Sequence, residues 1–270
     1  MASIINNPSA LQAQRNLANS QAGLNSTINR LSTGLRINRA SDDAAGLSIS
    51  NNLRADIRVL NQARRNANDG LGRLAVVDLT AEEASNLLTR ASELAEQAAS
   101  GTTTSAGRVA LDAEFTQIKE ALDALDSDVK FDGVSVFGQD FTVRVGEEAT
   151  ESITVSSFNI SSSATGIAIN SDNLLTSNAA STALGNILSA IETVSSRRGD
   201  IGAKQARLET IVNSLGVTTE NLTAAESQIR DADIASEVVN LTKFQILSQS
   251  GVSALAQANQ SAQSVLSLLG

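Results

Sequence analysis

Leucines recur at seven-residue steps near the start of the chain. Leu17, Leu24 and Leu31 form one stripe, and Ile28 and Leu35 fill intermediate positions of the same seam. A heptad-like repeat of this kind is typical of a helix that packs along a partner helix in a coiled coil. Aliphatic residues at helical spacing also run to the end of the chain, where we expect the matching seam to comprise Val252, Leu255, Leu266 and Leu269. The pattern predicts that the two ends of the chain lie side by side.

The longest helical pattern runs from about 44 to 99. The carboxylates of Asp42 and Asp43 favour a helix start, and Gly101 favours a stop. Gly70 and Gly72 lie inside the pattern and weaken it, because glycine is a poor helix former. An unbroken helix of this length would measure ~84 Å at about 1.5 Å per residue, whereas a compact chain of this size has a diameter near ~50 Å. We therefore expect an elongated rod.

A small strand region interrupts the helical pattern. A third helix is expected at 106–128, and helical spacing returns from about 184 to the end. Between them, alternating segments occur at 134–136, 141–145 and 153–155, with turn signals at Asp132-Gly133, Gly138 and Gly146. Five of the six Phe lie between 115 and 158, so we expect this region to have a core of its own, followed by an irregular segment at 156–178. The sequence thus predicts a mainly α fold: a rod of long helices with a terminal coiled coil and a small β-hairpin region near 131–170.

The composition removes most enzyme chemistry. The 270 residues include no Cys, His, Trp or Tyr. This excludes disulfides, thiol nucleophiles, a Ser–His–Asp triad, and haem, iron–sulfur or imidazole metal sites. The acidic segment 231–237 lacks the residues that a calcium loop requires at its fifth and sixth positions. We expect no catalytic residue, no metal and no cofactor; an unrecognised enzyme would depend on a perturbed carboxylate or Lys.

Charge is distributed unevenly. The net charge is −9, yet residues 1–41 contain no Asp or Glu, and Lys243 is the only charged residue from 240 to 270. Nucleic-acid binding normally rests on clustered Lys and Arg, so we expect none. Polar residues interrupt every apolar run well short of the ~20 residues of a membrane span, so we expect no membrane insertion. The start also lacks the apolar stretch of a signal peptide.

The terminal helices therefore present aliphatic stripes on surfaces with hardly any charge. We expect them to be loose in the monomer and to order when copies of the chain pack together, because uncharged faces avoid like-charge repulsion between identical subunits. The alternative is that they are ordinary frayed termini. A generic cytoplasmic coiled-coil scaffold is a further alternative, but it should carry regular charges beside the seam.

Several long stretches resemble bacterial flagellin, the subunit of the flagellar filament. They include SALQAQRNLANSQ, RLSTGLRINRASDDAAGLSIS and ARRNANDG near the start, and RRGDIGAKQARLE, ENLTAAESQIRDADIASE and QILSQSGVSALAQANQSAQSVLSLL near the end. The resemblance covers about 1–133 and 180–270 and implies a minimal two-domain form without large central insertions. It implies an inner coiled-coil domain of 1–40 with 235–270 lining the filament channel, and an outer helical domain of 41–234.

The resemblance also implies function and partners. The chain would self-assemble as a homopolymer into the extracellular filament used for swimming, after handling by an export chaperone and the flagellar type III export apparatus. A hook–filament junction protein, which shares the terminal helices, is the alternative. The family's contact with an innate immune Toll-like receptor, also partly a subunit contact, falls here on Arg90, Glu93, Leu94, Gln97 and Glu114. The competing interpretation of the charged members is a solvated salt-bridge cluster.

Overall fold

The computed structural model describes residues 7–148, 150–163 and 166–269, with side chains described through 261. The chain forms two compact units: Met1–Ala55 with Asn221–Gly270, called the terminal unit below, and Asp56–Glu220, called the central unit. The terminal unit thus includes residues 41–55 and 221–234 in addition to the two segments expected to form a coiled coil. The mainly α fold class is confirmed.

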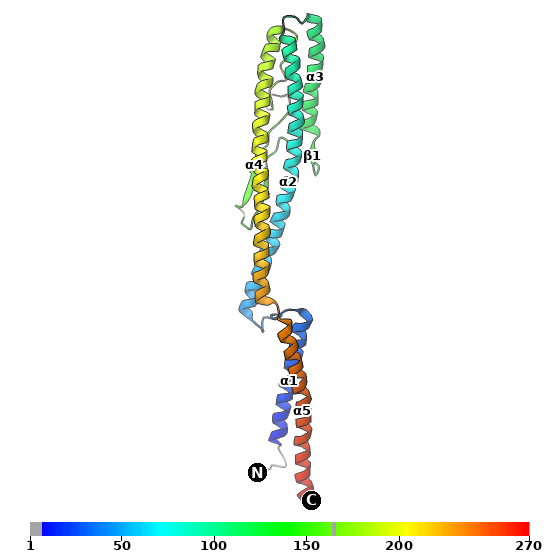
Figure 1. The fold of residues 1–270 in the computed structure, drawn as a ribbon, viewed down its shortest axis with the longest axis vertical. Helices are drawn as coiled ribbons and strands as arrows, with labels where there is room; N and C mark the ends of the chain where they lie inside the picture. The colour runs from blue at the N-terminus through cyan, green and yellow to red at the C-terminus, as the bar shows by residue number, and fades with distance from the viewer. Residues whose placement is uncertain (1–6, 149, 164–165, 270) are drawn as a thin grey trace. The chain divides into compact units, whose positions relative to one another are not determined.

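Helices α1 (Pro8–Thr33) and α5 (Ile234–Leu269) run side by side in the terminal unit (Figure 1). The sequence fixes both ends of α1. The Asn7 side chain accepts a hydrogen bond from the backbone N–H of Ala10 at 3.1 Å, and Pro8 occupies the first turn, where a missing N–H costs nothing. Gly34 ends the helix at φ 72°, a left-handed conformation that glycine adopts without strain.

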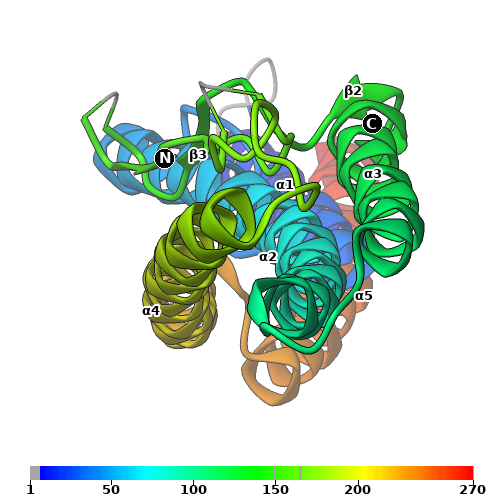
Figure 2. The same cartoon turned by 90° about the horizontal axis from the view of Figure 1, so that it is seen from above.

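Three helices build the central unit. The predicted helix at 44–99 is confirmed as α2 (Ala44–Ala99), and the predicted third helix as α3 (Ser105–Asp128). Helical spacing that reappears from 184 belongs to one 54-residue helix, α4 (Ser177–Arg230). Both views show α2 between α3 and α4 (Figures 1 and 2). Several alanines of α2, among them Ala67, Ala81 and Ala84, are fully buried and belong to the core of this unit.

The strands form two short antiparallel hairpins. In the first, β1 (Lys130–Phe131) pairs with β2 (Val134–Ser135); in the second, β3 (Phe141–Arg144) pairs with β4 (Ser152–Val155). Asp132 and Gly133 have φ 50° and 76°, as the predicted turn at this dipeptide requires. Among the described residues, the last strand of the expected β region ends at Val155.

Gly70 and Gly72 do not interrupt α2. Both face the hairpins, and at Gly70 the close packing requires glycine. A Cβ on Gly70 would lie 2.7 Å from Cγ2 of Val143, so only glycine lets β3 lie this close to the helix. At Gly72 the nearest ring atom of Phe131 would lie at 3.7 Å, an ordinary contact. The glycines therefore mark the position where the hairpins meet α2.

The expectation of a separate core for the strand region is wrong. Phe137 and Phe158 meet edge to face at 5.5 Å between ring centroids, but Phe115, Phe137 and Val143 belong to one continuous buried cluster with residues of α2, α3 and α4. Two-stranded hairpins are marginal alone and need a helix surface to bury their apolar side chains. The largest fully buried members of this core include Leu74, Leu88, Phe115, Leu122, Ile187 and Leu208.

One face of α3 holds the irregular segment 156–176. Asp112, Asp123 and Asp126 each accept a hydrogen bond from a backbone N–H of this segment at 2.7 to 2.8 Å. Lys119 Nζ donates to two of its carbonyls at 3.3 and 2.9 Å. These side chains recur at helical spacing, so they stand in one row. The row gives partners to backbone groups that no strand or helix satisfies.

Candidate functional site

The paired terminal helices are the first candidate site. Asn7 Nδ2 donates to the carbonyl of Ala258 at 3.0 Å, and Ser248 Oγ donates to Gln21 Oε1 at 3.2 Å, so the helices are antiparallel. Nearer the middle, the Phe244 ring lies where a Cβ on Gly23 would stand, 2.5 Å from Phe244 Cε1. A glycine on α1 thus admits the one aromatic side chain of α5.

The residues predicted as a seam divide into three groups. A half-buried group lies along the pair: Leu17, Leu24, Leu31, Leu35 and Leu255. Ile28 and Val252 are 47% and 56% exposed, so the pairing of α1 with α5 does not cover them. The side chains of Leu266 and Leu269 lie outside the described residues. The pairing of α1 with α5 therefore buries only some of the predicted seam residues.

Large aliphatic side chains that the sequence pattern did not single out are also exposed on these helices. Val239 is the most exposed of them at 67%. The others are Leu11, Ile234, Val238, Ile246 and Leu247. Together with Ile28 and Val252 we call them the aliphatic strip. The two helices carry only four charged residues between them, two of which pair with each other. Exposed aliphatic side chains on a surface with so few charges are typical of an interaction site, which makes this strip a candidate.

Within the terminal unit, two backbone hydrogen bonds connect the segment that follows α1 to the end of α4 and to the connection between α4 and α5. The backbone N–H of Arg36 donates to the carbonyl of Arg230 at 2.7 Å, and the N–H of Ala232 donates to Gly34 at 2.9 Å. Beside this ladder, Arg30 Nη1 lies 3.3 Å from Oε1 of Glu237, which is only 7% exposed. Removing Arg30 would leave the buried carboxylate of Glu237 without its partner.

The second candidate site lies at the α2–α3 turn. Arg90 on α2 forms ion pairs with Glu93 one turn along at 2.9 Å and with Glu114 on α3 at 2.8 Å, so these three side chains lie together. The hydrogen bond to Glu114, then that to Glu93, raises the pKa of Arg90 above its ordinary value. All three side chains are about half exposed, so the cluster contributes little to stability. Its effect is to fix the guanidinium in one orientation.

The other two residues predicted at this site, Gln97 and Leu94, differ in exposure. Gln97 is exposed, and its backbone carbonyl accepts a hydrogen bond from Thr103 Oγ1 in the turn. Leu94 is only 1% exposed and packs in the core of the central unit. In this structure Leu94 therefore supports the helix that presents Arg90 and Glu93, and does not form the surface itself.

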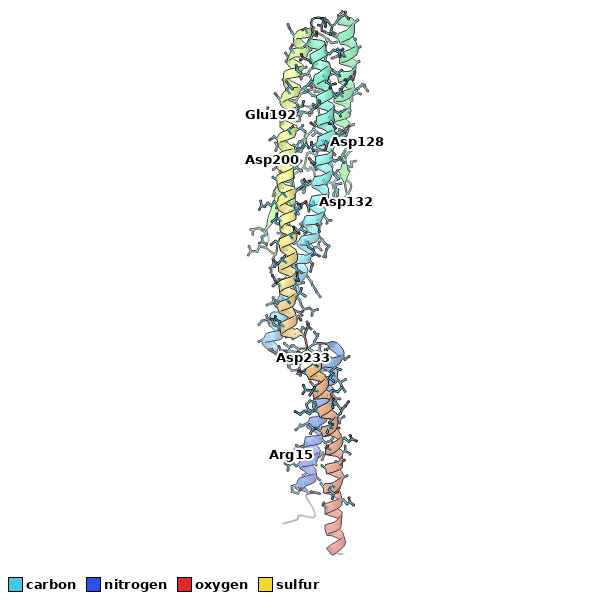
Figure 3. All side chains as sticks on the ribbon, in the orientation of Figure 1. Arg15, Asp128, Asp132, Glu192, Asp200 and Asp233 are labelled. Carbon is cyan, nitrogen blue, oxygen red and sulfur yellow. The ribbon has the colours of Figure 1, made fainter. Side chains whose placement is uncertain are left out.

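The acidic segment 231–237 has a structural role. Asp233 lies in the connection between α4 and α5 (Figure 3). Its Oδ1 accepts hydrogen bonds from the N–H groups of Ala235 and Ser236 at 2.9 and 3.3 Å, and Ser236 Oγ donates to Oδ2. The bond from the Ser236 side chain, followed by the two backbone bonds, lowers the pKa of Asp233. The residue caps the helix N-terminus.

In the part of the chain that the structure describes, no group of three or more acidic residues is arranged to hold a metal ion. Within the same part, no helix is long and apolar enough to cross a bilayer.

Comparison with known proteins gives a consistent result over nearly the whole chain. Residues 4–142 match the sequence model of the bacterial flagellin N-terminal helical region, and residues 184–269 match that of the C-terminal helical region, which leaves no room for a large central insertion. A flagellar filament 33 kDa core protein of Treponema phagedenis is 38% identical, with 98% of this chain and 99% of that protein aligned. A flagellin of Halalkalibacterium halodurans is also 38% identical over the same shares. A crystal structure of Bacillus cereus flagellin has a TM-score of 0.49 at 25% identity, covering 60% of this chain and 94% of that one.

Proposed function

The chain belongs to the bacterial flagellin family of structural filament proteins, which are not enzymes, and on that premise we propose that it self-assembles through its terminal helices into the helical flagellar filament used for swimming. One observation carries the proposal: the aliphatic strip remains exposed after α1 and α5 have paired. In this proposal residues 1–40 and 235–270 form the inner domain that lines the filament channel. Residues 41–234 form the outer domain.

The physical reason for assembly is that the pair of α1 and α5 does not bury all of its aliphatic surface. Burying aliphatic surface contributes about 25 cal/mol per Å², and the pair leaves several of its largest aliphatic side chains in water. Copies of the chain supply matching uncharged surfaces, so packing them together removes the strip from water without burying unpaired charge. A contact between different faces of identical subunits either closes into a ring or continues as a helix, and in this proposal it continues as a helix.

Seeded growth tests this function. Purified full-length chain is added to short filament fragments, and growth is followed by light scattering and electron microscopy. Elongation into long filaments is the expected result. Formation of only a short ring on the seeds would instead favour the hook–filament junction protein, and no addition at all would reject both.

Limited proteolysis tests the coupling of order to assembly. Cleavage within the first forty and last thirty residues is expected in dilute monomer and should disappear in the polymer. Ends that resist cleavage equally in both states would contradict the coupling.

Export through the flagellar type III apparatus, with a chaperone that covers the aliphatic strip before assembly, belongs to the same proposal. An exposed strip of this kind is an aggregation hazard in the cytoplasm. Cells that lack the flagellar export apparatus should retain the chain inside, whereas wild-type cells should release it. Equal release from both would contradict this route.

A second function, recognition by an innate immune Toll-like receptor, is favoured by the oriented Arg90 cluster. Its ion pairs hold the guanidinium in place, so less side-chain entropy is lost when a partner binds. Arg90→Ala should reduce receptor signalling by monomer, whereas Arg207→Ala, an exposed arginine on α4, should not. Unchanged signalling by Arg90→Ala would assign the cluster to a solvated salt bridge only.

A further inference from the structure

The dipeptide Asp-Gly occurs twice in the chain, as Asp69-Gly70 and as Asp132-Gly133. This dipeptide is chemically weak, because the backbone nitrogen of the glycine can attack the aspartate side chain with no Cβ in its way. Asn-Gly, which reacts in the same manner, does not occur. The first dipeptide lies within α2, and the second is the turn between β1 and β2, where Figure 3 labels Asp132.

Both aspartates line one recess of the central unit. The recess has a volume of about 370 Å³ and lies between α2 and the hairpins. Asp69 and Asp132 are both exposed, so water reaches the two carboxyl groups alike. Solvent access therefore does not distinguish the two dipeptides, and any difference in their reactivity must come from the backbone that holds each of them.

The backbone of Asp69-Gly70 is held in place. The dipeptide lies inside α2, where each backbone N–H donates to the carbonyl four residues earlier. Gly70 is buried, and a Cβ on it would lie 2.7 Å from Cγ2 of Val143, so β3 covers this stretch of the helix. Attack by the Gly70 nitrogen on Asp69 would require the helix to open and its backbone to rotate against β3. The fold therefore protects this site.

The backbone of Asp132-Gly133 has none of these restraints. Among the described residues, the N–H of Gly133 has no hydrogen-bond acceptor, and the Asp132 carboxyl has neither a hydrogen-bond nor an ion-pair partner. Beyond the two chain neighbours of Gly133, no described atom lies within 4 Å of the place where a Cβ on it would stand, so a new ring has room. The strands on either side have two residues each, and so short a hairpin opens readily.

We propose that Asp132 is a site of spontaneous isoaspartate formation, a covalent modification of the chain by itself. The nitrogen of Gly133 forms a bond to Cγ of Asp132 and loses its proton, and the hydroxyl of the protonated carboxyl leaves with that proton as water, which gives a succinimide ring. Water then opens the ring. Addition at Cγ restores aspartate, whereas addition at the main-chain carbonyl leaves the chain joined through Cβ and Cγ. The reaction needs no enzyme and no oxidant, and it does not depend on the proposed filament function.

The modification should release the first hairpin from α2. It inserts Cβ into the main chain of a two-residue turn, whose register pairs are Lys130 with Ser135 and Phe131 with Val134. The carbonyl of Ser135 accepts a hydrogen bond from Arg73 Nη2 of α2 at 3.1 Å, and that bond depends on this register. After the turn, the N–H of Val136 donates to the carbonyl of Val129 at 3.3 Å, so its exchange with solvent reports whether the hairpin is closed.

Peptide mapping of aged, folded chain tests the site. Trypsin separates the two dipeptides into the peptides 66–73 and 131–144, and mass spectrometry with electron-based fragmentation distinguishes isoaspartate from aspartate in each. Isoaspartate should form at least about tenfold faster in 131–144, because ring closure at Asp69 waits for a packed helix to open. Chain unfolded in guanidinium chloride should form it at similar rates in both peptides, which would show that the fold makes the difference.

Two variants at the turn sharpen the test. Asp132→Glu keeps the charge but would have to close a larger ring, so peptide 131–144 should stay unmodified. Asp132→Asn keeps a residue that accepts the left-handed turn and should form isoaspartate faster at neutral pH, with loss of ammonia in place of water. Equal isoaspartate at both sites of the folded chain, none at position 132, or no acceleration by Asp132→Asn would overturn the proposal. Isoaspartate at 132 without faster exchange at Val136 would overturn the release of the hairpin.

Discussion

The central and terminal units bury their aliphatic residues very differently. In the central unit, leucines such as Leu74, Leu88 and Leu208 are fully buried in one core that joins three helices and two hairpins. In the terminal unit, the seam leucines of α1 remain half-buried, and Val239 and Val252 are mostly exposed. The first unit satisfies its hydrophobic pattern within one chain. The second has the same kind of pattern but only one partner helix, and in the proposed filament neighbouring subunits complete it.

Leu88→Ala should produce the largest change that distinguishes the two units. Leu88 is fully buried, so truncation should lower the free energy of unfolding by about 3–5 kcal/mol through lost burial and a residual cavity. Leu11→Ala on α1 is the matched change in the terminal unit and should cost less than about 0.5 kcal/mol in the monomer. Urea denaturation followed by circular dichroism measures both. Equal losses would contradict the distinction between the units.

A substitution in the row of side chains on α3 should change the free energy of unfolding by less than Leu88→Ala does. Asp123→Ala removes the acceptor for the N–H and hydroxyl of Ser162, which is buried, and should lower the free energy of unfolding by about 1–3 kcal/mol. Asp123→Asn keeps a side-chain oxygen and should recover most of the loss. Hydrogen exchange of the 156–176 segment should accelerate in the Ala variant alone. Unaltered exchange there would show that the row does not hold the segment.

Val239→Asp should affect assembly and leave the monomer nearly unchanged. The side chain is 67% exposed, so the free energy of unfolding of the monomer should change by less than about 0.5 kcal/mol. Burying the new carboxylate between subunits is costly, so the critical concentration for elongation should rise about tenfold or more, or about 1.4 kcal/mol. Val239→Thr, similar in shape, should raise it less. Normal elongation by Val239→Asp would place the aliphatic strip outside the subunit contact.

One carboxyl contact in each unit should respond to acid, and the two should respond in opposite directions. The hydrogen bond from the Ser236 side chain lowers the pKa of Asp233, so the cap it gives α5 is present above the ordinary Asp pKa and is lost as pH falls through the lowered value. The hydrogen bond to Asp56 raises the pKa of Glu147, so that contact is present below the ordinary Glu pKa and is lost as pH rises through the raised value. Amide resonances of Ala235 and Glu148 should report these two changes.

Neutral variants isolate each group. Glu147→Gln keeps a hydrogen-bond donor toward Asp56 and should remove the pH dependence at the β3–β4 turn, while Asp233→Asn should remove it at the start of α5. A pH response that survives Glu147→Gln would show that another group titrates there.

The long helices followed directly from the sequence. The bounds of α2 match the predicted 44–99, because periodic aliphatics, a preceding pair of aspartates and a following glycine act locally. The Arg90 cluster was also predictable, because residues 90 and 93 share a helical face and a short turn returns Glu114 to the same level. In contrast, the exposure of Ile28 and Val252 was not predictable, because a periodic stripe does not specify how many neighbours a helix has.

The chain by itself determined where α2 and α3 begin and end, the turn at Asp132-Gly133 and the scarcity of charge at its ends, since these depend on neighbours within a few residues. Only the tertiary structure decided that the hairpins share the core of the helices, that the α3 row holds an irregular segment, and that Arg30 pairs with Glu237. Each of these depends on groups distant in sequence meeting at hydrogen-bond or van der Waals distance. No local pattern encodes such distances.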